Sequence, residues 1–298
     1  MRYVLITPAR NEAAYIGLAL DSVVSQKLKP AKWIIVNDGS TDNTAEIVSR
    51  YSSTHPWIEL LDMPQRVERH FGGKAAAVNS AYNRLSALDF DVVGNLDADV
   101  SFGPDYFEFL VSCFAENPKL GVAGTAFQEG NLSYNYELVG IEHVSGMIQM
   151  FRRSCFEEIG GYPALKSGGI DLIAVLSARA RGWQTRTFLE QKFTHHRTQG
   201  GALHTGVRER IHIGRKDYLL GNHPVWELFR GIYQMQYKPY FVGGLLVLSS
   251  FFWNVLKGTE KSIPDNLMRL RRNEQMARLK SIVQRRLGLA GFFSHKPS

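Results

Sequence analysis

The chain has 298 residues, of which 44% are hydrophobic and 21% charged, as is typical of a globular protein with one large domain or two ordinary ones. Its formal net charge of +7 favours anionic partners such as nucleotides, phosphorylated lipids, acidic membranes or nucleic acid. Cys113 and Cys155 lie in apolar segments without a CxxC or Cys/His array, which argues against a disulfide framework or structural zinc and favours a reducing compartment. The N-terminal apolar run is too short for a signal peptide.

The first 130 residues alternate between short apolar runs and segments with helical periodicity. This alternation predicts an α/β fold, a mostly parallel sheet flanked by helices, in which ligands bind at the carboxyl ends of the strands. The expected strands are 3–9, 32–39, 57–63, 91–100 and 120–128, and the expected helices are 12–26, 41–53, 73–88 and 104–117. Further on, strands are expected over 146–153 and 184–196, and helices over 154–160 and after Asp171.

The last third changes character. Residues 239–256 contain no charged side chain, but this segment lies at the short limit for a spanning helix. Residues 265–288 read as a basic amphipathic helix, and from 265 to 298 eight Lys and Arg stand against Asp265 and Glu274. A basic helix beside an apolar segment predicts in-plane or shallow attachment to a membrane surface rather than a span.

Asp97 and Asp99 end the fourth predicted strand, in "NLDADV". Residues two apart in an extended segment point the same way, so both carboxylates would lie on one side of the strand end. Such a pair suits a hard divalent cation that also binds substrate phosphates. A D-x-D sequence by itself is usually a solvated turn, but the apolar "VVGNL" before this one favours a metal site.

Two other strand ends carry polar residues. In "VNDGSTDNT", Asp38 precedes the capping residues of the next helix, which leaves its carboxylate for a nucleobase edge or a ribose. "GGKAAAVNSA" places two glycines and Lys74 before a helix, as in a phosphate-binding turn. The P-loop spacing and GxGxxG are both absent, which argues against a dinucleotide fold.

Five motifs in order resemble those of the family 2 glycosyltransferases with the GT-A fold: "TPARNEA", "VNDGSTDNT", "GGKAAAVNSA", "NLDADV" and "MFRRSCFEEIGGYP". Asn37 stands where the family has the first Asp of its D-D-G-S-T-D segment. The resemblance implies a GT-A catalytic domain, which we assign to residues 1–204. Its nucleotide-sugar-binding half would be 1–130 and its acceptor half 131–204, and 205–298 would form a helical, membrane-associated extension.

The resemblance also implies a nucleotide-sugar donor (UDP-, GDP- or dTDP-linked) and a bound Mg²⁺ or Mn²⁺. The metal would stabilise the charge on the departing nucleoside diphosphate. Asp99 would ligate this metal, with Asp97 beside it. The positions that match the family's donor site are Pro8, Ala9, Arg10, Glu12, Asp38, Lys74, Asp97 and Ala98.

Asp171 lies between a Gly-Gly turn and a predicted helix. By resemblance, the pair that is usually Glu-Asp before an Arg/Ala-Gly-aromatic segment falls on Ile170 and Asp171, ahead of "ARGWQT". The family's Asp is the general base that takes the acceptor hydroxyl proton as the anomeric carbon is inverted. A simple helix cap is the alternative, and we favour the base. Ile170 predicts a more apolar acceptor side than in relatives.

"FTHHRT" supplies His195 and His196 at a strand end. Neighbours on a strand face opposite ways, so at most one histidine points into the site. By resemblance a histidine here can complete the metal site, and we favour His195, with His196 as the alternate. Arg197 is a candidate bidentate contact for the diphosphate.

The leading hypothesis is therefore a metal-dependent inverting glycosyltransferase at the cytoplasmic face of the cell membrane, acting on a lipid-linked glycan or polysaccharide. A nucleotidyltransferase of similar fold would need a Gly/Arg/Lys-rich segment after the first strand, where "TPARNEA" has Asn-Glu instead. A nucleic-acid-binding protein would need an aromatic platform or a recognised motif beside its basic residues, so nucleic acid is not an expected partner. A non-catalytic relative remains the third alternative because Ile170 replaces Glu.

Overall fold

The computed structural model describes residues 1–64, 71–130, 136–165, 168–197, 206–236 and 239–286. The chain divides into two compact units, Met1–Gln199 and Gly200–Ser298, which are described separately. The predicted boundary between residues 204 and 205 lies outside the described residues.

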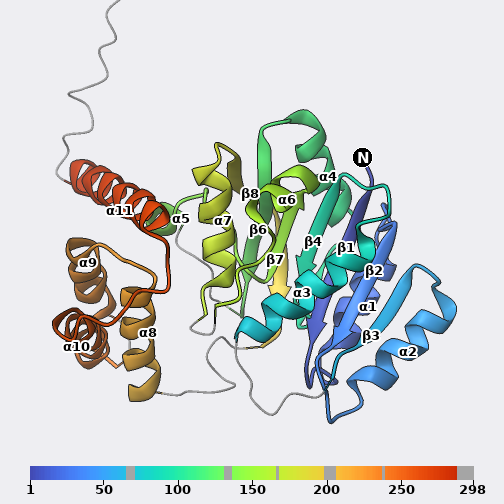
Figure 1. Ribbon diagram of the computed structural model, residues 1–298, viewed down its shortest axis with the longest axis horizontal. Coiled ribbons are helices and arrows are strands. Elements are labelled where there is room, and N and C mark those ends of the chain that lie inside the picture. The colour runs from blue at the N-terminus through green and yellow to red at the C-terminus, as the bar shows by residue number, and fades with distance from the viewer. Residues whose placement is uncertain (65–70, 131–135, 166–167, 198–205, 237–238, 287–298) are drawn as a thin grey trace, which may run out of the picture. The chain divides into compact units, whose positions relative to one another are not determined.

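One sheet of eight strands forms the centre of the N-terminal unit (Figure 1), in the order β3-β2-β1-β4-β7-β6-β8-β5. Four pairings among the described strands are parallel (β1–β2, β1–β4, β2–β3, β6–β8) and three are antiparallel (β4–β7, β6–β7, β5–β8), so the sheet is mixed. The strands are β1 (Tyr3–Ala9), β2 (Lys32–Asn37), β3 (Ile58–Asp62), β4 (Val92–Leu96), β5 (Val100–Phe102), β6 (Leu120–Gln128), β7 (Ile148–Arg152) and β8 (Gln184–His195).

Helices cover both faces of this sheet because its central strands are apolar on both sides. Along β1, Tyr3 and Leu5 pack into one cluster with α1, α2 and α4, whereas Val4 and Ile6 pack into the other with α3, α6 and α7. The helices of this unit are α1 (Ile16–Val24), α2 (Thr44–Thr54), α3 (Phe71–Leu85), α4 (Tyr106–Glu116), α5 (Tyr136–Val139), α6 (Arg153–Ile159) and α7 (Ile170–Ala180).

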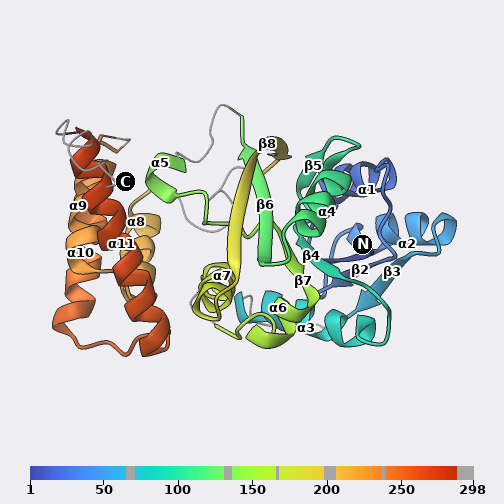
Figure 2. The same cartoon turned by 90° about the horizontal axis from the view of Figure 1, so that it is seen from above.

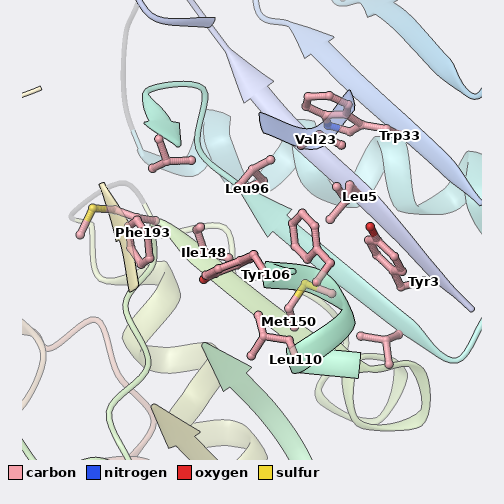
Figure 3. Packing of buried hydrophobic residues seen from close by; sticks show 14 of the residues in the cluster. Tyr3, Leu5, Val23, Trp33, Leu96, Tyr106, Leu110, Ile148, Met150 and Phe193 are labelled. Atoms are coloured by element: carbon pink, nitrogen blue, oxygen red, sulfur yellow. The ribbon is translucent and has the colours of Figure 1, made fainter. Parts of the chain in front are cut away.

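Aromatic rings fill the first cluster. Figure 3 shows Tyr3, Trp33, Tyr106 and Phe193 around the aliphatic chains of β1 and β4, and all four rings are almost fully buried. Burying such a ring contributes about 1.5–3 kcal/mol relative to leaving it exposed. This packing sets the strands that carry the candidate site in fixed positions.

The predicted elements are found, with one informative difference. The segment 91–100, expected as one strand, is broken into β4 and β5, and Asp97 to Asp99 form the turn between them. The expectation that the two aspartates stand in one extended strand is therefore wrong. The turn instead carries the chain from a parallel pairing with β1 to an antiparallel pairing with β8.

The described part of the C-terminal unit is helical, and Figure 2 shows its helices packed beside one another. They are α8 (Val207–Leu219), α9 (Pro224–Gln234), α10 (Val242–Leu256) and α11 (Asp265–Arg286). Glycines permit close packing, since a Cβ on Gly214 of α8 would collide with the α10 backbone at Val247, and one on Gly244 would collide with α9 at Gly231.

A polar network around Asn222, in the loop between α8 and α9, joins α9 to α11. Its amide donates to Glu227 Oε2 over 2.7 Å, and its carbonyl accepts from Arg271 Nε and Gln275 Nε2, each over 2.8 Å. All the described helices of the chain fall short of the length and apolarity that crossing a bilayer requires.

Candidate active site

Two loops at the carboxyl ends of β1 and β2 are tied together. Asp38 N–H donates to the Ala9 carbonyl over 2.8 Å, and the Thr41 amide donates to Asn11 Oδ1 over 2.8 Å. The Glu12 amide donates to Thr44 Oγ1 over 2.8 Å. Asn11 adopts a left-handed φ of 56°, which Asn tolerates better than most residues, and this turn directs the Glu12 segment back toward the β2 loop.

The residues predicted to hold the donor lie along this edge. Pro8, Arg10, Glu12 and Asp38 are half-buried at or just beyond the ends of β1 and β2. Ala9 is 1% exposed at the end of β1. Ala98 is also buried, and its methyl group packs into the hydrophobic cluster, so only its backbone can serve a ligand.

Lys74, from the first turns of α3, lies at the centre of the acidic residues. Its Nζ contacts Asp97 Oδ1 at 2.5 Å, and the carboxylates of Asp171 and Asp99 add to the field around it. Burial by itself would lower the pKa of Lys74, but attraction to Asp97 outweighs it and raises the pKa, so the ammonium stays charged. The structure thus brings three predicted carboxylates around one predicted cation.

A second cation connects the donor side to Asp99. Arg197 forms an ion pair with Glu12, and its Nε lies 3.4 Å from Asp99 Oδ2. The same guanidinium lies over the Tyr15 ring, 5.3 Å from its centroid. Arg197 therefore joins the loop after β1, the end of β8 and the D-x-D turn.

His195 faces Asp99, and His196 does not. His195 Nε2 lies 3.4 Å from Asp99 Oδ2, while His196 Nε2 is 2.7 Å from Ser101 Oγ. The two rings diverge because they are neighbours at the end of one strand.

Glu129 is a residue of this site that the sequence reading missed. Its carboxylate lies 2.8 Å from His195 Nδ1, and both side chains are buried. This contact fixes the imidazole ring with its other nitrogen toward Asp99. Glu129 directly follows β6. It is a polar residue at a strand end, the same signal that marked the other candidate residues in the sequence.

The charges around Asp99 keep it ionised. Burial would raise the pKa of Asp99, but the hydrogen bond to His195 and the charge of Arg197 hold the pKa below its usual value. Burial likewise opposes the imidazolium, yet contacts with Asp99 and Glu129 raise the pKa of His195. An ionised carboxylate beside a ring nitrogen is a suitable donor pair for a divalent cation.

Asp171 is not the cap of its helix. The N-cap of α7 is Gly169, at a left-handed φ of 80°, and Asp171 is the second helical residue, half-buried. The cap alternative therefore loses its structural basis. Ile170 is 3% exposed and packs into the hydrophobic cluster with Ala174 and Val175, so it adds core rather than an apolar acceptor surface.

Gly146 is a second residue that the sequence did not reveal. A Cβ at this position would lie 2.5 Å from Asp171 Oδ2, so the glycine leaves the space that the carboxylate occupies. Its carbonyl accepts from Asn95 Nδ2 over 3.2 Å and lies 3.5 Å from Lys74 Nζ. Nothing in the local sequence around Gly146 marks it, because its neighbours come from distant segments.

A buried tyrosine supports the same helix start. Tyr162 O–H donates to Gln149 Oε1 over 2.5 Å, and Gln149 Nε2 reaches the Asp171 carbonyl at 3.5 Å. Burial, followed by the charges of Asp171 and Asp97, raises the pKa of Tyr162, which therefore remains a neutral donor. Asp171 is thus held by backbone contacts, which leave its carboxylate on the side of Lys74.

Comparisons with known proteins show which family the chain resembles in sequence. Residues 4–162 match the family described as "Glycosyl transferase family 2". A poly-beta-1,6-N-acetyl-D-glucosamine synthase of Staphylococcus epidermidis is 31% identical over 170 residues, which cover 50% of this chain and 39% of that protein. The succinoglycan biosynthesis protein ExoA of Rhizobium meliloti (strain 1021) is 30% identical over 186 residues, 53% of this chain and 52% of that protein. The chain thus spans about half or less of the length of these relatives.

Solved structures share the fold at lower identity. A mannosyltransferase from Pyrobaculum calidifontis, in complex with GDP-Man and Mn²⁺, superposes with a TM-score of 0.59 at 19% identity, covering 95% of this chain and 86% of that one. S. aureus TarS 1–349, in complex with UDP-GlcNAc, gives a TM-score of 0.53 at 13% identity, covering 87% and 74%. The predicted GT-A fold is confirmed.

Proposed function

The chain belongs to glycosyl transferase family 2, and we propose that it is a metal-dependent inverting enzyme that moves a sugar from a nucleoside diphosphate to an acceptor hydroxyl. The observation that carries this proposal is the gathering of Asp97, Asp99 and Asp171 around Lys74 at the carboxyl edge of the sheet. In this proposal Asp99 binds the metal and Asp97 holds Lys74, and both cations neutralise the charge of the diphosphate. Asp171, at the start of α7, removes the acceptor proton.

The donor would lie along the tied loops after β1 and β2. Asp38 and Glu12 would accept hydrogen bonds from the nucleoside, beside the backbone of Pro8, Ala9 and Arg10. Lys74 and Arg197 would face the diphosphate with their positive charges, Arg197 as a bidentate donor. Arg197 now pairs with Glu12 and Asp99, so we expect it to exchange these partners when the donor binds.

Asp99 and His195 are the residues that would hold Mg²⁺ or Mn²⁺, with Asp97 close by. His195 Nε2 and Asp99 Oδ2 lie 3.4 Å apart, so small side-chain shifts would let both atoms bind one small cation. The bound ion would supply Lewis-acid stabilisation of the leaving diphosphate. The Mn²⁺ complex of the Pyrobaculum calidifontis mannosyltransferase supports a divalent cation for this fold.

Asp171 would remove the acceptor proton. As the acceptor oxygen forms its bond to the anomeric carbon, the bond from that carbon to the diphosphate breaks, and its electron pair leaves with the nucleoside diphosphate. The acceptor proton passes to the Asp171 carboxylate, and the configuration at the anomeric carbon is inverted.

We propose a lipid-linked glycan or growing polysaccharide as the acceptor, at the cytoplasmic surface of the cell membrane. The names of the relatives support this class, since the S. epidermidis protein is a polysaccharide synthase and the R. meliloti protein acts in succinoglycan biosynthesis. We also propose that residues 1–130 serve the donor and 131–204 the acceptor.

A donor screen tests the reaction class. UDP-, GDP- and dTDP-sugars are incubated with Mn²⁺ or Mg²⁺ and candidate acceptors, and released nucleoside diphosphate is measured. We expect release with one donor group and its loss on chelation. Binding and turnover of no sugar nucleotide would contradict the proposal, and pyrophosphate release from a nucleoside triphosphate and a sugar phosphate would indicate nucleotidyl transfer instead.

The Asp171→Asn variant tests the base. We expect donor and metal binding to persist while transfer falls by about 10²–10⁴-fold, as for the loss of a general base. Glu108→Gln is the matched control, because Glu108 is an exposed acid in the first turn of another helix, α4. Transfer at the parental rate in Asp171→Asn would remove Asp171 from the mechanism.

A further inference from the structure

The outward side of α10 is mostly apolar and is interrupted by the exposed Ser249. Phe241, at the N-cap, Leu245, Phe252 and Leu256 follow one another at helical spacing and are 69%, 54%, 37% and 81% exposed. Trp253, 58% exposed, lies beside this stripe. We call these five residues the α10 face. No charged residue occurs between 239 and 256.

The α10 face is not needed for the fold of its unit. The opposite side of α10 makes the internal contacts, through Gly244 and Val247 against α9 and α8, and through a Ser250 Oγ–H bond of 2.7 Å to the Ile211 carbonyl. Contiguous exposed apolar surface on a folded protein usually marks an interaction site. The α10 face is therefore a surface for a partner.

The ends of the helix are suited to a water–lipid boundary. Lys257, just after α10, places its Nζ 4.9 Å from the centre of the Trp253 ring. Trp and Lys are the side chains that anchor helices at membrane interfaces, because each combines an apolar body with a polar tip. At the other end, Phe241 has a left-handed φ of 56°, a backbone conformation that is unfavourable for a bulky residue. Its ring is exposed to solvent.

The charge of the C-terminal unit distinguishes between an anionic surface and a second copy of the chain as the partner of the α10 face. Residues 200–298 carry sixteen Lys and Arg against six Asp and Glu, whereas residues 1–199 carry nineteen against twenty-two. Two of the six acids, Asp217 and Glu227, are buried. The C-terminal unit is thus strongly cationic, which opposes pairing with a second copy of itself and favours an anionic surface.

We propose that the α10 face docks on an anionic lipid bilayer, lying in the interface with Trp253 and Lys257 at the headgroup level. The apolar side chains would enter the acyl boundary, and the positive charge of the C-terminal unit would attract the headgroups. α11 contributes charge rather than insertion, since only Val283 among its described side chains is a strongly exposed large apolar residue. The inference extends the proposed function, because a lipid-linked acceptor would occupy the same bilayer.

Vesicle co-sedimentation of the full chain tests this docking without donor or acceptor. Vesicles of phosphatidylcholine with phosphatidylglycerol are compared with pure phosphatidylcholine. We expect binding to the anionic vesicles, weakened at high salt, and at least about tenfold weaker binding for Leu245→Gln/Trp253→Gln/Leu256→Gln. These side chains are exposed, so the triple variant should fold, which circular dichroism and nucleotide binding check.

A second triple variant, Leu18→Gln/Leu88→Gln/Leu189→Gln, is the control, because these leucines are also exposed but lie in the N-terminal unit. It should bind vesicles like the parent chain. Absence of vesicle binding, equal binding to neutral vesicles, or equal binding by the α10 variant would overturn the proposal. So would a dimer in light scattering that the α10 variant abolishes. Sugar-nucleotide binding, measured in solution, reports separately on the proposed function.

Discussion

At the scale of single residues, the candidate site is a set of charges that satisfy one another before any ligand arrives. Lys74 pairs with Asp97, and Arg197 pairs with Glu12 and Asp99. Each of these groups is also a proposed ligand contact, so binding a donor and a metal would replace internal ion pairs with external ones. Gly146 and Glu129 are not proposed ligand contacts, but they position Asp171 and His195. Their substitution should therefore change one function of the site and spare the others.

Gly146→Ala should impair transfer more than donor binding. The added Cβ would lie 2.5 Å from Asp171 Oδ2, so the carboxylate must move away from its position. A displacement on the order of 1 Å of a catalytic group can cost about 10²-fold in rate, and we expect kcat to fall by roughly that factor. Steady-state kinetics and nucleotide titration would measure the two effects. Gly17→Ala is the control, since nothing lies within 4 Å of its added Cβ, and it should behave like the parent.

Glu129→Gln should weaken the metal site. The substitution removes the charge that holds the His195 ring through its Nδ1, and loss of such a supporting contact commonly costs about 10–100-fold in metal affinity. The Mn²⁺ concentration for half-maximal activity should rise, while the rate at saturating Mn²⁺ changes less. Glu116→Gln, at an exposed position of α4, is the control and should keep the parental Mn²⁺ requirement. The same requirement in Glu129→Gln would show that Glu129 has no such role.

At the scale of elements, strand ends and helix starts decide which side chains reach the site. The break between β4 and β5 turns Asp97 toward Lys74 and Asp99 toward His195. Gly169 takes the N-cap position of α7 and frees Asp171 from capping. In the C-terminal unit, by contrast, a few polar side chains, such as Glu227 and Gln275, turn inward and join the helices through Asn222.

The Glu227 carboxyl, fully buried in α9, should make the stability of this helical unit depend on pH. Burial, with the nearby Asp217 charge, raises the pKa of Glu227 to about 7 despite Arg230 and Asn222. The folded state binds this proton more tightly than the unfolded chain, so the stabilisation is fully present below the ordinary Glu pKa and is lost as pH rises through about 7. We expect a loss on the order of 2 kcal/mol between about pH 5 and about pH 8.

Hydrogen exchange of peptides from α8 and α9, corrected for intrinsic exchange rates, measures this change. Glu227→Gln should remove most of the pH dependence, because an amide does not ionise and can still accept from Asn222. Glu260→Gln, at an exposed position of the same unit, should keep the parental profile. Equal pH dependence in the two variants would contradict a role for Glu227.

At the scale of the whole molecule, the two units differ in charge and in the role that we propose for each. The acidic unit carries the candidate active site and the cationic unit carries the α10 face. The sequence predicted shallow membrane association for the apolar segment 239–256, beside a basic amphipathic helix at 265–288. The structure assigns apolar exposure to α10 and positive charge to α11, because the apolar side chains of α11 such as Leu267 pack inward.

The sequence by itself determined the element order, the α/β class, the family and the identity of the carboxylates at the strand ends. These follow from local periodicity and from short motifs, which are properties of contiguous residues. Only the tertiary structure decided that His195 rather than His196 faces Asp99, that Glu129 holds His195, that Gly146 makes room for Asp171, and that Ile170 is core. Those relations join residues far apart in the chain, and sheet packing, which no local pattern encodes, brings them together.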